Sequence, residues 1–314
     1  MIHISHQYTL TVISHADKLS EEQIKYVEEM LFPKWKVTTL TKEVLGSNNR
    51  VIDYHVRAET PENVNQQVKL ELLQDSPSSG YDIIFQKRDT RDNKRLFVFD
   101  MDSTLIYQEV IELIAAYAGI EDKVAEITER AMNGELDFNE SLRERVLLLK
   151  GIDATSIWEE LKHKIVITNG ARELCQALKK LGCVMAVCSG GFIPLAEHVK
   201  TELGLDYAYA NQLGTTSEGI LDGTTRGVIV NGDKKAELLL EIATKHDVDP
   251  KDAVAVGDGA NDLNMMAAGG FGVAWNAKPK VQLLAPCCLN TKSLQDILYI
   301  MGFNDEKIKE LTSK

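Results

Sequence analysis

Three apolar runs along the chain each end on a small group of polar residues. They are LFVFD at 96–100, VMAVCS at 184–189 and DAVAVGD at 252–258. Runs without alternating polar positions are typical of strands that helices cover on both faces. Apolar residues at helical spacing fill the segments 170–182, 193–204 and 234–247. This alternation predicts an α/β fold with a doubly wound parallel sheet, whose ligand site lies beyond the carboxyl ends of the strands.

The insert between the first two of these strands is too long for a single crossover helix. It runs from Gln108 to about residue 181, whereas a crossover needs roughly a dozen residues or somewhat more. Its apolar spacing predicts helices at 109–119, 121–132, 137–151 and 156–164. We therefore expect a helical cap at about 108–181 that covers the strand ends.

The first 90 residues follow another pattern. Apolar stretches at 8–15, 34–40, 49–58 and 81–86 alternate with predicted helices at 20–32 and 61–74. This β-α-β-β-α-β order resembles the ferredoxin-like sandwich of amino-acid-sensing, ACT-like regulatory domains. A structural, a dimerising and a sensing role all stay open for it, and the second would make the protein a homodimer.

A polar run, QKRDTRDNKR at 86–95, separates the two patterns. It carries no apolar periodicity and directly precedes a strongly apolar strand, which is typical of a domain boundary. We therefore expect an α+β domain at 1–90 and a second domain at 91–314. The length of 314 residues agrees with roughly two domains.

Composition narrows the class of partner. Hydrophobic residues make up 44% and charged residues 26% of the chain, as in globular proteins. The net charge of −12 argues against nucleic acid and anionic membranes as partners, and no apolar run approaches the length of a membrane span. Five cysteines without a C-x-x-C pair indicate reduced thiols, so we expect a cytoplasmic protein.

Carboxylates follow two of the three apolar strands. Asp100 and Asp102 end the first strand, and Asp258 and Asp262 follow the third. Two like charges about 4 Å apart repel by about 4 kcal/mol at an effective dielectric constant of about 20, and a hard metal ion or a proton relieves this repulsion. Alone, the D-x-D pattern also fits a solvated acidic turn or the metal site of a sugar-nucleotide transferase. The second acidic strand end favours one composite ligand site.

The complete set of motifs is more specific than any one of them. DMDSTLI at 100–106, SGGF at 189–192, a lysine and GDGANDL at 257–263 together resemble the haloacid dehalogenase superfamily, and within it the phosphoserine phosphatases. The resemblance covers about residues 96–300. It implies Mg²⁺-dependent hydrolysis of O-phospho-L-serine to L-serine and phosphate through an aspartyl-phosphate intermediate, the last step of L-serine biosynthesis.

The resemblance assigns the reacting groups residue by residue. Asp100 corresponds to the nucleophile, and Asp102 to the general acid that later acts as the base toward water. Asp258 and Asp100 would bind Mg²⁺, together with the peptide carbonyl of Asp102 and, nearby or through water, Asp262. Three carboxylates and a phosphate dianion carry −5, against +3 from Mg²⁺ and one lysine, so the metal removes much of the excess charge.

Further residues correspond to groups that bind the phosphate. Ser189 and the amide of Gly190 match donors to the phosphate, and Asn261 matches a residue that positions the substrate or Asp258. Lys235 matches the lysine that neutralises the transferring phosphoryl group. Lys234 is its neighbour and stays an alternative.

Four residues of the expected cap would recognise the rest of the substrate. Glu109 matches the partner of the substrate ammonium and Arg145 the bidentate partner of its carboxylate, while Met132 and Phe138 match apolar residues that exclude water. Each has a plainer interpretation: Glu109 at a helix N-terminus, Arg145 on a solvated helix face, and the two apolar residues in an ordinary core.

Two other functions stay open at this point. One is a phosphatase or phosphotransferase of the same superfamily acting on another small phosphomonoester. The other is a non-catalytic regulator that senses an amino acid through the N-terminal domain. The intact set of acids and the lysine favours an enzyme over a regulator.

Overall fold

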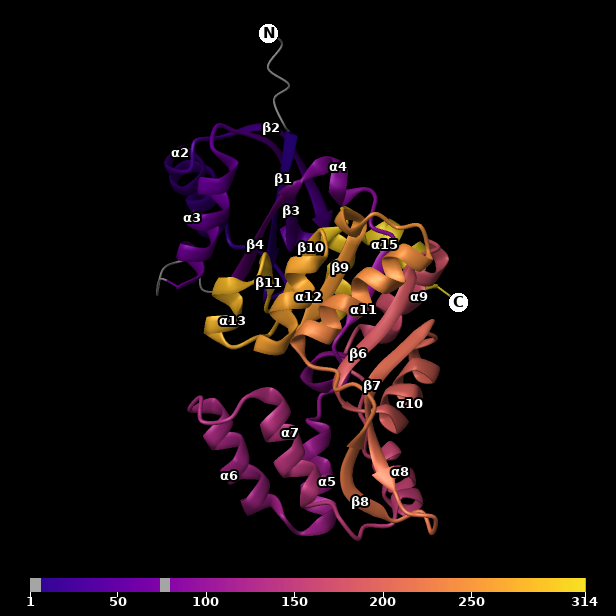
Figure 1. Cartoon of the computed structure of the whole chain (residues 1–314). Helices are drawn as coiled ribbons and strands as arrows, with labels where there is room; N and C mark the ends of the chain where they lie inside the picture. The colour runs from indigo at the N-terminus through magenta and orange to yellow at the C-terminus, as the bar shows by residue number, and fades with distance from the viewer. Residues whose placement is uncertain (1–6, 74–79, 314) are drawn as a thin grey trace.

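The computed structural model describes residues 7–73 and 80–313. Three parts follow one another along the molecule: an N-terminal domain, an α/β core and a group of helices inserted into the core (Figure 1). The core lies between the other two parts, so its sheet contacts both.

The N-terminal domain is a four-stranded antiparallel sheet with helices on one face. In sheet order its strands are β2 (Val37–Gly46), β3 (Val51–Ala58), β1 (Gln7–Ser14) and β4 (Tyr81–Lys87). Its helices are α1 (Glu21–Tyr26), α2 (Phe32–Lys34) and α3 (Pro61–Leu73), with a π-helical turn at Val27–Leu31. The predicted β-α-β-β-α-β order is confirmed, although residue 74 of the second predicted helix lies outside the described residues.

The core is a seven-stranded sheet that is parallel except at one edge. In sheet order its strands are β11 (Cys287–Leu289), β10 (Phe271–Trp275), β9 (Ala253–Gly257), β5 (Leu96–Phe99), β6 (Val184–Phe192), β7 (Tyr207–Thr215) and β8 (Leu221–Arg226). Only the β7–β8 pair is antiparallel. The pattern of apolar residues did not predict these two strands. The predicted fold class, an α/β core with a helical insertion and an N-terminal α+β domain, is confirmed.

Helices cover both faces of this sheet, which explains the continuous apolar runs. Phe97 and Phe99 belong to one buried cluster, whereas Leu96 and Val98 belong to the cluster on the opposite face. Successive strand residues point to opposite faces, so both sets must be apolar. The covering helices are α9 (Ala171–Lys180), α10 (Ile193–Leu203), α11 (Gly232–Lys245), α12 (Leu263–Ala268), α13 (Pro279–Leu284), α14 (Ile297–Ile300) and α15 (Asp305–Thr312).

The insertion after β5 contains four helices. They are α5 (Val110–Ala118), α6 (Glu121–Met132), α7 (Phe138–Leu147) and α8 (Ala154–Lys162). Asp137 begins α7 with a capping box, because its carboxylate accepts the amide of Glu140 while the Glu140 side chain accepts the Asp137 amide. The next helix, α9, packs on β6 of the core sheet. The domain bounds 1–90 and 91–314 and the cap bounds 108–181 stay predictions.

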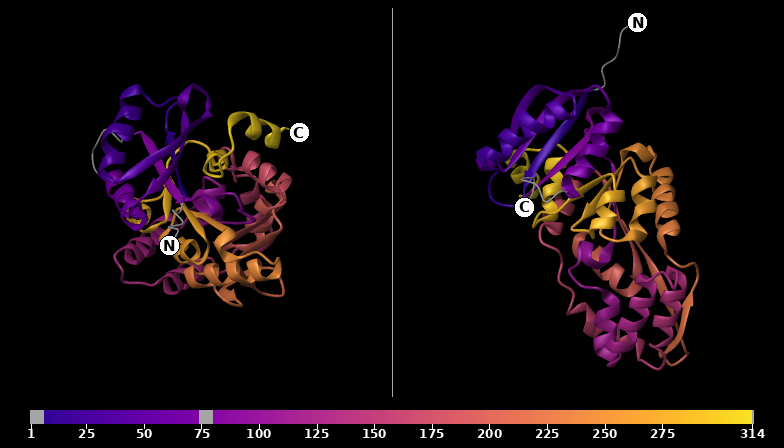
Figure 2. Two further views of the ribbon diagram at one scale, coloured as in Figure 1. Left: turned by 90° about the horizontal axis from the view of Figure 1, so that it is seen from above. Right: turned by 90° about the vertical axis from the view of Figure 1, so that its left-hand side faces the viewer.

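The N-terminal domain packs on the core through its helix-free face (Figure 2). Ile13 and Ile84 of its sheet belong to the same buried cluster as the core helices. Arg50 forms a bidentate ion pair with Asp296, with N–O distances of 2.9 and 2.6 Å. Such a planar pair fixes orientation as well as contact. The junction is therefore both apolar and specifically hydrogen-bonded.

Two predictions from the sequence concern membrane spans and the cysteines. No helix within residues 7–73 and 80–313 is long and apolar enough to cross a membrane. All five cysteines are buried and free, in agreement with the prediction of reduced thiols.

Lys94, between the N-terminal domain and the core, makes the stability of the folded protein depend on pH. Its side chain is 7% exposed, and its ammonium lies 5.0 Å from the centre of the Phe271 ring and has no hydrogen-bond partner in the described residues. Burial lowers its pKa to about 8, against a partial offset from Asp252. The unfolded chain therefore binds more protons than the folded one between about pH 8 and the ordinary value of 10.5.

We predict that Lys94→Met stabilises the protein near neutral pH by about 1–3 kcal/mol, because it removes the cost of burying a charge. The gain should shrink as the pH rises through about 8, where the native lysine loses its proton. Urea unfolding at neutral and alkaline pH measures both effects. The exposed Lys87→Met is the matched control, and an equal gain in both variants would contradict the argument.

Candidate active site

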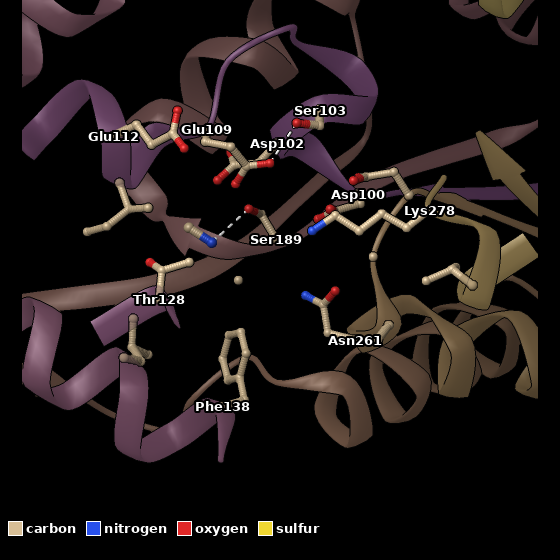
Figure 3. A pocket seen from close by; sticks show the side chains of 18 of the residues that line it. Asp100, Asp102, Ser103, Glu109, Glu112, Thr128, Phe138, Ser189, Asn261 and Lys278 are labelled. Carbon is tan, nitrogen blue, oxygen red and sulfur yellow. Dashed lines mark hydrogen bonds between the residues drawn. The ribbon is translucent and has the colours of Figure 1, made fainter. Parts of the chain in front are cut away.

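A cavity of about 670 Å³ lies between the carboxyl ends of the core strands and the inserted helices. The close view shows Asp100 and Asp102 on its core side and Phe138 and Thr128 on the side of the insertion (Figure 3). Most of the sequence-predicted site residues line this cavity; they are Asp100, Asp102, Glu109, Phe138, Arg145, Ser189, Gly190, Asp258 and Asn261. The topology therefore brings together residues separated by up to 161 positions in the sequence.

Asp100 shares a buried ammonium group with Asp262. Lys235 of α11 donates to Asp100 Oδ1 at 2.6 Å and to Asp262 Oδ1 at 2.7 Å, and its side chain is fully buried. Burial alone would lower the pKa of Lys235, but the two carboxylates raise it above its ordinary value. The lysine is therefore a permanent cation. Lys234 instead pairs with Glu237 and Glu241 at the surface, so only Lys235 reaches the acids.

The acids come together because their strands are neighbours. β5 pairs in parallel with β9, and the amide of Asp100 donates to the carbonyl of Val256 at 2.8 Å. Asp258, which follows β9, therefore lies beside Asp100, which follows β5. Gly257 is required here, since a Cβ at this position would lie 2.3 Å from Asp262 Cγ. Asp262 also accepts the amide of Gly259 at 3.0 Å, which orients its carboxylate.

Three carboxylates form a group that suits a metal ion. Ligand oxygens of Asp100, Asp258 and Asp262 lie within 4.8 Å of one another. Burial, and next the charge of Asp262, raise the pKa of Asp100 to about 8 and that of Asp258 to about 7. One ammonium does not balance three carboxylates, and a divalent cation would neutralise the remaining −2. Hard oxygen ligands of this kind fit Mg²⁺ or a similar ion.

Asp102 is in a different environment from Asp100. It follows in the turn at Met101–Leu105, where Ser103 takes a left-handed conformation with φ of 54°. One carboxylate oxygen accepts the amide of Val110 at 3.3 Å, and the other is buried without a hydrogen-bond partner in the described residues. Burial, then the charges of Asp100 and Glu109, raise its pKa well above the ordinary value. These surroundings therefore favour the protonated form of Asp102.

The SGGF segment places hydrogen-bond donors beside these acids. Ser189 is fully buried, and its hydroxyl accepts the amide of Gly191 at 2.9 Å, which leaves the hydroxyl proton free to donate. Asn211 of β7 holds this segment, since it donates to the carbonyl of Gly190 at 2.8 Å and accepts the amide of Val230 at 2.8 Å. Sequence reasoning missed this positioning role, because a lone asparagine carries no motif.

Glu109 and Arg145 lie on the insertion side of the cavity. Glu109 accepts the hydroxyl of Ser103 at 2.6 Å, which the close view shows as a dashed line (Figure 3). Arg145 is half-buried, and its Nε donates to the carbonyl of Ser141 at 3.2 Å, which leaves the terminal nitrogens without a protein acceptor within the described residues. Burial lowers the pKa of Arg145, and Glu109 is the first group to oppose this. The cavity thus holds one anion and one cation on the same side.

The two predicted apolar residues have different outcomes. The Phe138 ring faces the SGGF segment so closely that a Cβ on Gly190 would lie 2.8 Å from Phe138 Cζ. The position of the Met132 side chain lies outside the described part of the structure. Asn261 projects toward the same space from the core side (Figure 3), and Gly259 is required beside it, since a Cβ there would lie 2.3 Å from Asn261 Oδ1.

The site also has residues, in or next to the cavity, to which the sequence motifs assigned no role. Thr104 donates its hydroxyl to Asp258 at 3.0 Å and so orients this carboxylate. Thr128, Lys278 and Lys280 line the cavity as well. The D-x-D-x-T pattern contains Thr104 and could have suggested it. The lysines follow the β10 strand end, a position that could have suggested a site residue.

Comparison with known proteins agrees with this geometry. The haloacid dehalogenase-like hydrolase family matches residues 94–270. The phosphoserine phosphatase of Saccharomyces cerevisiae is 46% identical over 303 residues, which are 96% of this chain and 98% of that protein.

Two solved structures match the core and the insertion. One is a phospho-aspartyl intermediate analogue of phosphoserine phosphatase and the other a substrate-bound phosphoserine phosphatase complex. Each is 42% identical, has a TM-score of 0.61 and covers 66% of this chain, and the matches span 98% and 97% of those chains. The resemblance predicted from the motifs is confirmed: the chain belongs to the phosphoserine phosphatases of the haloacid dehalogenase-like hydrolase family.

Proposed function

We propose that this enzyme hydrolyses O-phospho-L-serine to L-serine and phosphate, the last step of L-serine biosynthesis, and that Asp100 carries the phosphoryl group between the two half-reactions. The observation that carries the proposal is the different surroundings of two neighbouring carboxyl groups. Asp100 accepts a hydrogen bond from the Lys235 ammonium, whereas Asp102 lacks such a cation and its surroundings favour the protonated form. A nucleophile and a general acid are the two groups that this reaction needs.

In the first half-reaction a carboxylate oxygen of Asp100 attacks phosphorus. The bond between phosphorus and the serine oxygen breaks, and Asp102 gives its proton to that oxygen, so serine leaves as the neutral alcohol. The hydroxyl of Ser189 and the amide of Gly190 are placed to donate to the phosphoryl oxygens. Lys235 stabilises the charge that the transferring group spreads over its oxygens.

In the second half-reaction Asp102, now ionised, accepts a proton from water. The water oxygen bonds to phosphorus as the bond to the Asp100 oxygen breaks, and phosphate is released with Asp100 restored. The carboxyl group of Asp102 thus acts first as an acid and then as a base.

The metal that we propose is Mg²⁺. Asp100, Asp258 and Asp262 would hold it, with the peptide carbonyl of Asp102 as a further ligand, and Thr104 orients Asp258 for this role. When bound, the ion supplies positive charge to the phosphate and keeps Asp100 ionised. Without compensating charge, burial and the neighbouring acids leave Asp100 with a pKa of about 8, which disfavours the nucleophilic form.

Selectivity for phosphoserine is proposed to come from Glu109 and Arg145. Glu109 attracts the substrate ammonium, and the planar guanidinium of Arg145 pairs with the substrate carboxylate. Phe138 lies against Gly190 and keeps water from the reacting oxygens. Asn261 reaches the cavity from the core side and is placed to orient the substrate. Met132 is proposed to join Phe138 in this apolar cover.

We predict that Asp100→Asn lowers turnover of phosphoserine by at least about 10³-fold while the fold is retained, since the amide is not a nucleophile. Steady-state phosphate release and thermal unfolding test the two halves of this prediction. Asp122→Asn, on the exposed face of α6, is the matched control. Acid-quenched enzyme should carry one phosphoryl group on the peptide that contains residue 100, and an adduct at any other residue would exclude Asp100 as nucleophile.

Removal of metal should abolish phosphate release, and added Mg²⁺ should restore it, because three carboxylates and a phosphate dianion otherwise share one cation. Mg²⁺ should also raise the melting temperature of the substrate-free protein by binding only the folded state. Asp258→Asn should lose most of this thermal shift. Full turnover in excess EDTA would contradict the metal-dependent mechanism.

Arg145→Ala should reduce kcat/KM for phosphoserine by about 100-fold or more, since a buried charge partner of the substrate carboxylate is lost. Hydrolysis of an aryl phosphate, which has no carboxylate, should change by less than about threefold. Arg143→Ala removes the same charge from an exposed position on the same helix and serves as the control. Equal losses on both substrates would favour a phosphatase for another phosphomonoester.

A further inference from the structure

Two lysines at the entrance of the cavity have no part in the proposed chemistry. Lys278 and Lys280 flank the start of α13, and both line the cavity that contains Asp100. Both are exposed, and neither ammonium forms an ion pair or hydrogen bond with the described part of the chain. The close view shows the Lys278 side chain directed into the cavity (Figure 3).

The negative charge around this entrance indicates a function for the two lysines. Carboxylates of Asp100, Asp102, Glu109, Glu112 and Asp258 line the cavity. The whole chain carries −12, and phosphoserine arrives as an anion. Mobile ammonium groups at the entrance lower the electrostatic barrier for such a substrate, provided that they are held at the cavity and not elsewhere on the surface.

A chain of hydrogen bonds holds the backbone that carries Lys278. Gln282 of α13 donates to the carbonyl of Ala277 at 2.6 Å and to Asn290 Oδ1 at 2.8 Å. Asn290 in turn donates its side-chain amide to Gln282 Oε1 at 3.1 Å. Both hydrogens of the Gln282 amide are therefore used, one on the loop and one on Asn290.

The far end of this chain belongs to the N-terminal domain. Asp82 of β4 is 1% exposed and accepts the backbone amide of Asn290 at 2.6 Å and its side-chain amide at 2.9 Å. Both Asp82 oxygens accept hydrogen bonds from Asn290, so the Asn290 amide nitrogen faces Asp82 and its oxygen accepts from Gln282. The Gln282 amide nitrogen also donates to the Ala277 carbonyl, which can only accept. Asp82 and the Ala277 carbonyl, one at each end, thereby favour the same direction for every bond in the chain.

We propose that Asp82 is a positioning residue for substrate entry, which acts through Asn290 and Gln282 on the Ala277–Lys278 backbone and holds the Lys278 ammonium at the cavity. The N-terminal domain thus contributes to the cavity without touching it. This inference rests on the proposed function, because it assigns the lysine to the capture of the anionic substrate.

The test compares three variants in the full-length enzyme. Lys278→Met removes the charge, Gln282→Met breaks the middle of the chain without touching the N-terminal domain, and Asp82→Asn replaces one of the two oxygens that accept from Asn290 with a donor. Each should raise KM for phosphoserine about 3- to 10-fold at low ionic strength and change kcat by less than about twofold. Each should also weaken the dependence of kcat/KM on salt, because a steering charge is lost or misplaced.

Double variants separate positioning from general destabilisation. Asp82→Asn and Gln282→Met should add no further loss of kcat/KM to Lys278→Met, since all three act through one ammonium group. Losses that multiply would overturn the proposal. Two controls change comparable groups away from the cavity: Lys292→Met removes an exposed charge, and Gln86→Leu breaks another bond between the domains, from Gln86 to the carbonyl of Ile300 at 2.7 Å.

The outcomes are distinct from those that test the proposed function. An unsubstituted enzyme that does not hydrolyse phosphoserine would overturn the proposed function, and this inference with it. An active enzyme in which Asp82→Asn and Gln282→Met have the KM and salt dependence of the Gln86→Leu control would overturn the positioning role alone.

Discussion

The buried contact of Lys235 with Asp100 and Asp262 is the constraint on which the site depends. One ammonium lies 2.6 and 2.7 Å from two carboxylates that are almost entirely removed from water. Without this cation, the repulsion between the acids at the ends of β5 and β9 would oppose the pairing of these strands. With it, one negative charge remains on that pair of carboxylates, and Asp258 adds another. The core is therefore stable enough to fold around an acidic site that still attracts a divalent cation.

Two aspartates within three residues of sequence are proposed to have opposite roles. Asp100 lies against a permanent cation, whereas Asp102 lies next to Glu109 and has one oxygen without a hydrogen-bond partner in the described residues. The Lys235 contact distinguishes the proposed nucleophile Asp100 from the proposed proton donor Asp102, a difference that residue type alone cannot make.

The position of the core between the two other parts of the molecule has a further consequence. Arg145, the proposed partner of the substrate carboxylate, comes from the insertion, while Ser189, a proposed donor to the phosphate, comes from a strand end. The N-terminal domain packs on the opposite side of the core and still reaches the cavity entrance through Asp82 and Asn290. Directional bonds between amide groups make this possible, because each member has only one orientation that satisfies its neighbours.

The apolar runs and the acids that follow them were enough to predict the parallel core, the inserted helices and the order of elements in the N-terminal domain, and the family resemblance added nine of the residues that line the cavity. This succeeded because a strand buried on both faces must be apolar throughout, and because a site of hard ligands at strand ends leaves a compact motif. Only the tertiary structure decided that Lys235 and not Lys234 reaches Asp100, since adjacent helix positions differ in direction by about 100° and the packing of α11 selects one. Asn211 and Asp82 escaped prediction for a related reason: each acts through a partner distant in the chain, and such pairing leaves no local pattern.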